Sequence, residues 1–339
     1  MMNSCKRKTR NTLAALLFSV APAMLSGTSA LATDVPLFSP DAYGKVVLPL
    51  NESLGDAAET IRKQGNIFEP LSELRKDDPL RIRARAIGRL DLLVENAGKR
   101  SLVTCTASIV SVDLLLTNYH CIPGKQGKIV KASLLLDYEK SDGSGTTRIP
   151  VEPRALEGNA GLDYALARLL APVPSDISPL KLSTSFVKPR EQLLMIHHPA
   201  GQTKKMSRFK CLASKSTPQK GPYVRHVCES LPGSSGGILF NTRSGAVGLH
   251  HSGGLDKNDP DSFNKGTLLS RLIASSRTLK KLVGRIAAPK RPLPGHSGPK
   301  SARHTVRTGN TGNINNLLEN ARKKPGDTSS SINDMLAQP

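Results

Sequence analysis

Tryptophan is absent from this chain of 339 residues, and aromatic residues make up only 4% of it. Acidic residues are also few: 27 stand against 48 lysines and arginines, which leaves a net charge of +21. Modules that bind nucleic acid usually interleave aromatic and basic residues, so the low aromatic content argues against a basic nucleic-acid binder despite the charge. A hydrophobic content of 38% excludes a wholly disordered protein, and the length excludes a small scaffold held by disulfides alone.

Long apolar runs are missing as well, apart from one near the N-terminus. Four basic residues between positions 6 and 10 precede a mostly apolar stretch, 13–25, and small residues then lead to Ala30-Leu31-Ala32. This order is typical of a cleaved signal peptide, here residues 1–32. A membrane anchor would need about 20 apolar residues in a row. We therefore expect a secreted or periplasmic protein with no membrane span and a charge of +17 after cleavage.

Cysteine is scarce too, with five residues in the whole chain. Cys5 would leave with the signal peptide, so four remain: Cys105, Cys121, Cys211 and Cys228. An even number in an oxidising compartment suggests two disulfides, and four cysteines allow three connectivities. No C-x-x-C spacing supports the alternative of a zinc site. The short separations within Cys105–Cys121 and Cys211–Cys228 are typical of loop closures and favour that pairing.

Apolar patterning divides the rest of the chain. Residues 33–84 form an N-terminal extension with helical patterns at 52–63 and 69–76. From there to residue 286, short apolar runs alternate with turn residues; the runs are 87–94, 102–110, 114–117, 129–136, 164–169, 193–197, 236–240 and 245–250. Many short strands at such intervals predict an all-β barrel or sandwich.

The C-terminal part has two further patterns. Apolar residues at helical spacing between Leu268 and Ile286 predict an amphipathic helix that packs on the strands. Residues 287–339 contain no Phe, Tyr or Trp and are rich in Pro, Gly, Ser and basic residues. Such a composition is typical of a disordered basic tail.

Three segments carry residue types suited to nucleophilic catalysis. Residues 231–237 read Leu-Pro-Gly-Ser-Ser-Gly-Gly, where glycines permit a tight turn that presents a serine hydroxyl and aims N–H groups at an oxyanion. The apolar run 114–117 leads into His120, and Asp163 opens the apolar run 164–169. Singly, such a histidine is more often structural and such an aspartate more often a turn residue.

Together with Ile-His-His-Pro-Ala-Gly at 196–201 and Val-Gly-Leu-His-His-Ser-Gly-Gly at 247–254, these segments form a specific joint pattern. Over residues 84–286 the chain resembles the chymotrypsin-like serine endopeptidases, in their bacterial trypsin-like and glutamyl-endopeptidase branch. The resemblance implies two six-stranded antiparallel β-barrels, over residues 85–286, with the active site between them. Protein or peptide substrates, a monomer, and no metal or other cofactor are expected.

The resemblance also implies a role for each residue. Ser235 would attack the scissile carbonyl, His120 would carry the proton, and Asp163 would orient the imidazole. The N–H groups of Gly233 and Ser235 would form the oxyanion hole. The second serine of the loop, not Ser234, is the attacker in the family pattern. The Cys105–Cys121 pair matches the family's bridge at the histidine loop.

Specificity and processing stay open at this point. The resemblance places His250 and Ser230 where glutamyl-specific relatives hold an acidic side chain, whereas Glu229 in the same pocket would favour Lys or Arg. His197 and His198 are expected to be scaffolding residues. The basic stretch ending at Arg85 suggests a propeptide, residues 33–85, with a permanently attached extension as the equal alternative. A catalytically inactive binding protein of the same fold is the second functional hypothesis, against which the complete triad argues.

Overall fold

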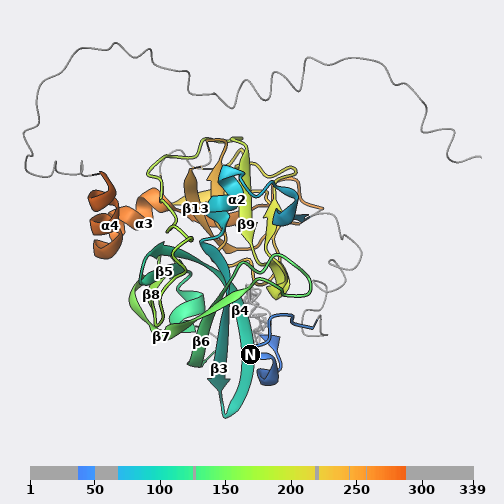
Figure 1. Ribbon diagram of the computed structural model, residues 1–339. Coiled ribbons are helices and arrows are strands. Elements are labelled where there is room, and N and C mark those ends of the chain that lie inside the picture. Colours follow the sequence, from blue (N-terminus) through green and yellow to red (C-terminus); the bar gives the residue numbers. More distant parts are fainter. Residues whose placement is uncertain are drawn as a thin grey trace, which may run out of the picture. The chain divides into compact units, whose positions relative to one another are not determined.

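The computed structural model describes residues 37–49, 68–124, 127–217, 221–243, 245–256 and 258–287 (Figure 1). The expected signal peptide, the expected helix at 52–63 and the tail from residue 288 lie outside these ranges. Within the described part of the chain, no helix is long and apolar enough to cross a membrane.

Six antiparallel strands of the N-terminal half close into a barrel. Their order is β4-β3-β6-β7-β8-β5, and β5 pairs back onto β4. The strands are β3 (Ile87–Asn96), β4 (Lys99–Ser111), β5 (Leu114–Thr117), β6 (Lys128–Leu136), β7 (Thr147–Asn159) and β8 (Tyr164–Leu169). The short strand β1 (Leu37–Phe38) adds to β4. Every residue of the run Leu-Leu-Leu-Thr in β5 is buried, which explains its unbroken apolar character.

A second antiparallel sheet contains the strands of the C-terminal half, in the order β11-β14-β13-β12-β9-β10. These are β9 (Leu193–His197), β10 (Lys205–Ser207), β11 (Tyr223–His226), β12 (Ile238–Asn241), β13 (Ala246–Ser252) and β14 (Asn264–Leu268). Isolated bridges Gln192↔Leu212 and Ala213↔His226 connect the start of β9 to the end of β11. The sheet therefore closes through residues 212–213, beside the disulfide Cys211–Cys228. The expected two-barrel, all-β architecture is confirmed.

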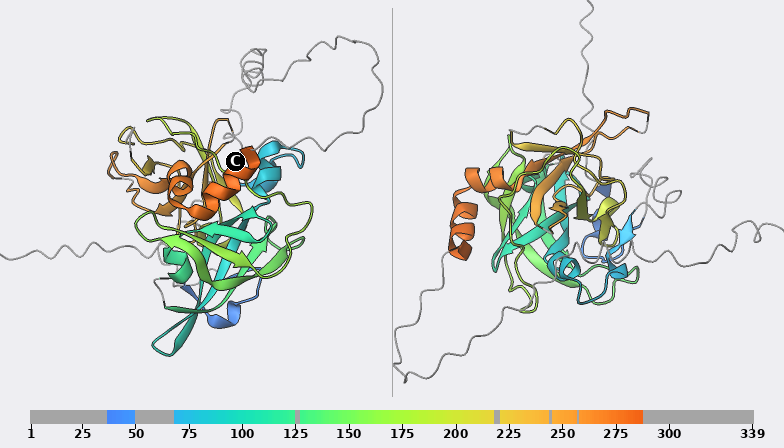
Figure 2. Two further views of the ribbon diagram at one scale, coloured as in Figure 1. Left: turned by 90° about the vertical axis from the view of Figure 1, so that its left-hand side faces the viewer. Right: turned by 90° about the horizontal axis from the view of Figure 1, so that it is seen from above.

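The C-terminal helix expected from Leu268 to Ile286 is divided in two, α3 (Leu269–Ser275) and α4 (Arg277–Ala287), which lie together beside the sheets (Figures 1 and 2). Ser276 between them has extended backbone, with φ −84° and ψ 127°, and its hydroxyl accepts a hydrogen bond from Leu279 N at 3.0 Å. Serine favours such an N-cap position, so the helix restarts there.

The described end of the N-terminal extension, residues 68–84, differs from its sequence expectation. In place of a helix at 69–76, Glu69 and Pro70 form strand β2 (Glu69–Pro70), which pairs with β10, and a 3-10 turn, η3 (Leu71–Glu73), follows. Pairing with β10 at the sheet edge tolerates Pro70, whose missing N–H disfavours a helix interior. An α-helix, α2 (Pro79–Ala84), follows, and the Asp78 side chain caps it at Leu80 N.

A buried arginine fixes the extension to the first barrel. The Arg89 guanidinium donates to the carbonyls of Lys45 and Val46 at 2.9 and 2.7 Å and to that of Gly201 at 2.8 Å. It also pairs with the equally buried Asp91, at 2.7 and 3.0 Å. Three segments far apart in the sequence therefore meet at one cation.

Candidate active site

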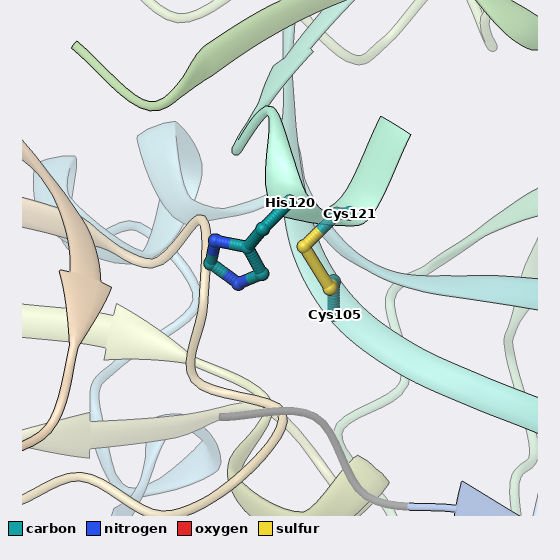
Figure 3. A group of neighbouring side chains, drawn as sticks. All are labelled: Cys105, His120 and Cys121. Atoms are coloured by element: carbon teal, nitrogen blue, oxygen red, sulfur yellow. A yellow bond between two sulfur atoms is a disulfide. The ribbon is translucent and has the colours of Figure 1, made fainter. Parts of the chain in front are cut away.

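The histidine loop leaves the first barrel at the end of β5 and is held by a disulfide. Cys121, next to His120, is bonded to Cys105 in β4 (Figure 3). Cys105, His120 and Cys121 are close enough for a metal site, with ligand atoms within 4.8 Å of one another. Because the two sulfurs are bonded to each other, they offer no thiolate to a metal, and the cluster holds the loop that carries the imidazole.

His120 and Asp163 are in direct contact. His120 Nδ1 lies 2.7 Å from Asp163 Oδ2, and the backbone N–H of His120 donates to Oδ1 of the same carboxylate at 3.0 Å. Asp163 has a left-handed φ of 48°, and Asn118 Nδ2 donates to its carbonyl at 2.8 Å. Aspartate tolerates this conformation better than most residues, which suits it to the turn before β8.

Electrostatics favour the ionised form of this carboxylate. Burial would raise the pKa of Asp163, but the hydrogen bond from His120 and the nearby imidazole outweigh it, so the pKa lies below its ordinary value. The other ring nitrogen, His120 Nε2, is buried and has no hydrogen-bond partner among the described residues. A neutral His120 with its proton on Nδ1 can therefore accept a proton at Nε2.

The serine loop precedes β12 in the second barrel and lies against β4 of the first. Gly233 and Gly236 have left-handed φ values of 94° and 87°, and a Cβ at Gly236 would lie 1.9 Å from the Thr106 carbonyl oxygen. Only glycine fits there. Thr106 N donates to the Ser235 carbonyl at 2.7 Å, and the Thr106 hydroxyl donates to the Gly233 carbonyl at 3.0 Å. Since Thr106 follows Cys105, β4 connects the serine loop to the histidine loop.

Both adjacent serines of the loop are buried, and the side-chain contacts of Ser234 are internal to the second barrel. Ser234 Oγ accepts from Leu231 N at 3.0 Å and lies 2.7 Å from Nδ1 of the buried His197. The Ser234 hydroxyl is therefore engaged by His197 and Leu231.

Comparison with known proteins agrees with this arrangement. Residues 105–249, which include all three loops, match the family model described as the trypsin-like peptidase domain. This segment is a trypsin-like peptidase domain. A relative, the uncharacterized protein y4fB of Sinorhizobium fredii, is 26% identical over 192 residues, and the match covers 51% of this chain but only 28% of that protein.

Three solved structures are similar to the peptidase domain. GrC is 17% identical with a TM-score of 0.44, over 59% of this chain and 96% of that one. A protease of M. tuberculosis in its active form is 15% identical with a TM-score of 0.43, over 63% and 86%. A Glu endopeptidase in complex with MPD is 12% identical with a TM-score of 0.43, over 60% and 90%.

Of the expected specificity residues, Ser230 lies in the loop after β11 and His250 lies in β13. Ser230 Oγ accepts from Asn264 Nδ2 at 3.0 Å, and His250 Nδ1 lies 3.1 Å from His226 Nε2. Asn264 and His226 are register partners in β14 and β11, so both residues contact the same strand pair. Burial lowers the pKa of His226 to about 3 and that of His250 well below its ordinary value, so both imidazoles are neutral at pH 7.

Several residues that support the site were not assigned to the triad from the sequence. His251 Nδ1 lies 4.0 Å from Asp163 Oδ2, so a second imidazole flanks the carboxylate of the peptidase domain. Burial lowers the pKa of His251 to about 4, against the opposing effect of Asp163. Thr106, Asn118 and Asn264 were also missed, because a single buried polar residue within a strand or turn has no distinctive spacing.

Proposed function

We propose that this protein is an exported serine endopeptidase that hydrolyses peptide bonds through an acyl-enzyme on Ser235. The observation that carries the proposal is the His120–Asp163 contact of 2.7 Å, with Nε2 of the same ring lacking a partner among the described residues. The Thr106 contacts place the serine loop against β4, which the disulfide Cys105–Cys121 joins to the histidine loop. Two disulfides are compatible with an oxidising compartment.

In the proposed reaction, His120 Nε2 takes the proton of Ser235 Oγ while that oxygen attacks the scissile carbonyl. Asp163 holds the proton on Nδ1 and stabilises the imidazolium that forms. The N–H groups of Gly233 and Ser235 stabilise the oxyanion. His120 then protonates the leaving amine, the acyl-enzyme remains on Ser235, and water activated by the same imidazole releases the acid.

Ser235→Ala tests this assignment, with Ser234→Ala as the matched control. We expect Ser235→Ala to lower kcat by about 10⁴-fold to 10⁶-fold, since triad members act as a unit, and Ser234→Ala to cost far less. A fluorophosphonate should label wild type at Ser235 and leave Ser235→Ala unlabelled. An adduct on Ser234 would refute the assignment, and an unlabelled wild type would favour the inactive binding protein.

Primary specificity depends on which groups meet the first substrate side chain. A neutral His250 with Ser230 favours an acidic side chain, whereas Glu229 would favour a basic one. Matched peptides that differ only in Glu or Lys before the scissile bond decide between them. Preference for Lys that Glu229→Gln abolishes would assign the pocket to Glu229, and preference for Glu that His250→Phe abolishes would assign it to His250.

A further inference from the structure

A chain of four hydrogen-bonded groups, three of them buried side chains, runs behind the serine loop and takes no part in the proposed reaction. It joins Ser234, His197, Ser207 and the carbonyl of Glu229 through contacts of 2.7, 3.0 and 2.8 Å. His197 and Ser234 are wholly buried and Ser207 is nearly so. They come from β9, β10 and the serine loop, so the chain of contacts joins the loop to two neighbouring strands of the second sheet.

The hydrogen atoms of this chain have one consistent arrangement. The Ser207 hydroxyl donates its only proton to the Glu229 carbonyl, so at His197 Nε2 it must accept. His197 therefore carries its proton on Nε2, and its bare Nδ1 accepts from the Ser234 hydroxyl. Ser234 Oγ in turn accepts from Leu231 N at 3.0 Å. Every group has a partner, and none carries a charge.

Burial supports the neutral form. It lowers the pKa of His197 to about 3, aided by the nearby His226 and Lys205, so this imidazole is uncharged at pH 7. The edge of the Phe68 ring, from the N-terminal extension, packs against it with ring centroids 5.3 Å apart. A buried polar network in which every member is satisfied rigidifies its surroundings.

We propose that His197 is a positioning residue for the serine loop. It holds Ser234 on one side and, through Ser207, the Glu229 carbonyl on the other, so residues 229–234 are fixed at both ends. That segment leads from the expected specificity residue Ser230 to the oxyanion-hole residue Gly233. The inference rests on the proposed function. It adds an uncharged hydrogen-bonded network behind the oxyanion hole, formed by Ser234, His197, Ser207 and the Glu229 carbonyl, which we call the brace.

The consequence is a loss of turnover rather than of substrate binding. If the brace is removed, Gly233 and Ser235 lose their fixed position relative to His120, and small displacements of catalytic groups are costly. We expect His197→Phe to lower kcat on the order of tenfold to a hundredfold, with KM for the same peptide changing less than about threefold. Ser234→Ala should change kcat in the same direction, because it removes the contact with His197 and also leaves Leu231 N without its acceptor.

Two isosteric variants separate the halves of the brace. The side-chain amide of His197→Asn occupies the position of Nδ1 and can accept from Ser234, whereas that of His197→Gln occupies the position of Nε2 and can donate to Ser207. We expect His197→Asn to recover more of kcat than His197→Gln, because Ser234 adjoins the nucleophile. His198→Phe is the matched control. His198 is equally buried, and its ring Nδ1 donates a hydrogen bond to the Gln202 carbonyl. It should lower the melting temperature and leave kcat unchanged.

The measurements are kcat, KM, the rate of fluorophosphonate labelling and the melting temperature of each variant. Ser234→Ala and Ser207→Ala keep the inference testable if His197→Phe does not fold. Unchanged kcat and labelling rate in a less stable Ser234→Ala would overturn the inference, as would a KM that rises as much as kcat falls. Wild-type protein that takes no label would instead refute the proposed function, and the inference with it.

Discussion

Lowering the pH from neutral to about 5 is expected to destabilise the folded protein strongly, because its buried histidines are held neutral. Burial lowers the pKa of His197 and of His226 from 6.5 to about 3 each. The folded-state pKa is thus below the unfolded one, so the unfolded chain binds more protons. The stabilisation is complete above the unfolded pKa and is lost as the pH falls from 6.5 toward 3.

The magnitude follows from linkage. At about pH 5, each of these histidines is about 1.5 pH units below its unfolded pKa, which costs about 2 kcal/mol. The two together remove about 4 kcal/mol, out of the roughly 5–15 kcal/mol typical of folded proteins. His198 and His250, whose pKa values are also lowered by burial, act in the same direction.

The acidic residues titrate at lower pH than the range in which the histidines lose their stabilising effect. The pKa values of Asp163 and Glu157 lie below their ordinary values, so the stability that these carboxylates provide is lost only below about pH 4.

Urea unfolding of Ser235→Ala, which avoids self-digestion, would give the free energy of unfolding at each pH. The slope counts the protons taken up, and His226→Gln should take up one fewer. Equal stability at neutral pH and at about pH 5 would refute the neutral state of these imidazoles.

Two further outcomes are expected from variants. Removing the Cys105–Cys121 disulfide in Cys105→Ala/Cys121→Ala should cost about 2–5 kcal/mol of stability. Because this disulfide positions His120, its loss should lower kcat more than Cys211→Ala/Cys228→Ala does, and equal losses of kcat would contradict this. Non-reduced peptide mapping checks the pairing. Glu157→Gln should cost about 0.3–1 kcal/mol by denaturant unfolding, since the carboxylate accepts from Arg277 N and Thr278 N at the start of α4. Glu152→Gln, on the same strand, should cost less.

How much of the fold the sequence could predict depended on whether a strand is apolar along its length. All eight apolar runs of 87–250 overlap strands, because their residues are buried in a barrel. Strand β7 was missed: it contains Pro150 and Pro153, and apart from the buried Ile149 and Val151 its residues are half-buried or exposed. Its partners β6 and β8 impose the extended backbone, which is a tertiary effect.

The candidate site likewise combines residues that have a local sequence pattern with contacts that have none. His120, Asp163 and Ser235 were predicted from the joint pattern of their segments, since each adjoins an apolar run or lies in a glycine-rich loop. Contacts between residues far apart had no local signal. His197 and Ser234 are 37 residues apart, and the Glu157 carboxylate that caps α4 is 120 residues from Arg277. Long-range pairing of this kind follows from the fold and cannot be derived from local spacing.

The contacts around Arg85 bear on whether the extension is ever removed. Its guanidinium bonds to Asp137 and Asp176, at 2.8 and 2.9 Å. Ala84 and Ala86 on either side are wholly buried, and the Ala84 carbonyl accepts from the buried Lys204 Nζ at 2.8 Å. A protease would reach the bond after Arg85 only through local unfolding.

Of the two alternatives for the extension, these contacts favour the one in which it remains attached. Cutting after Arg85 would remove β2 from the edge of β10, and would take away the Lys45 and Val46 carbonyls that Arg89 uses inside the barrel. A buried cation that loses its partners is costly. We therefore expect the active protein to retain Lys45 and Val46 as well as residues 68–85, and trypsin to leave the Arg85–Ala86 bond of folded Ser235→Ala intact. N-terminal sequencing of the active, secreted form checks this, and an active enzyme that begins at Ala86 would show that residues up to Arg85 are a propeptide after all.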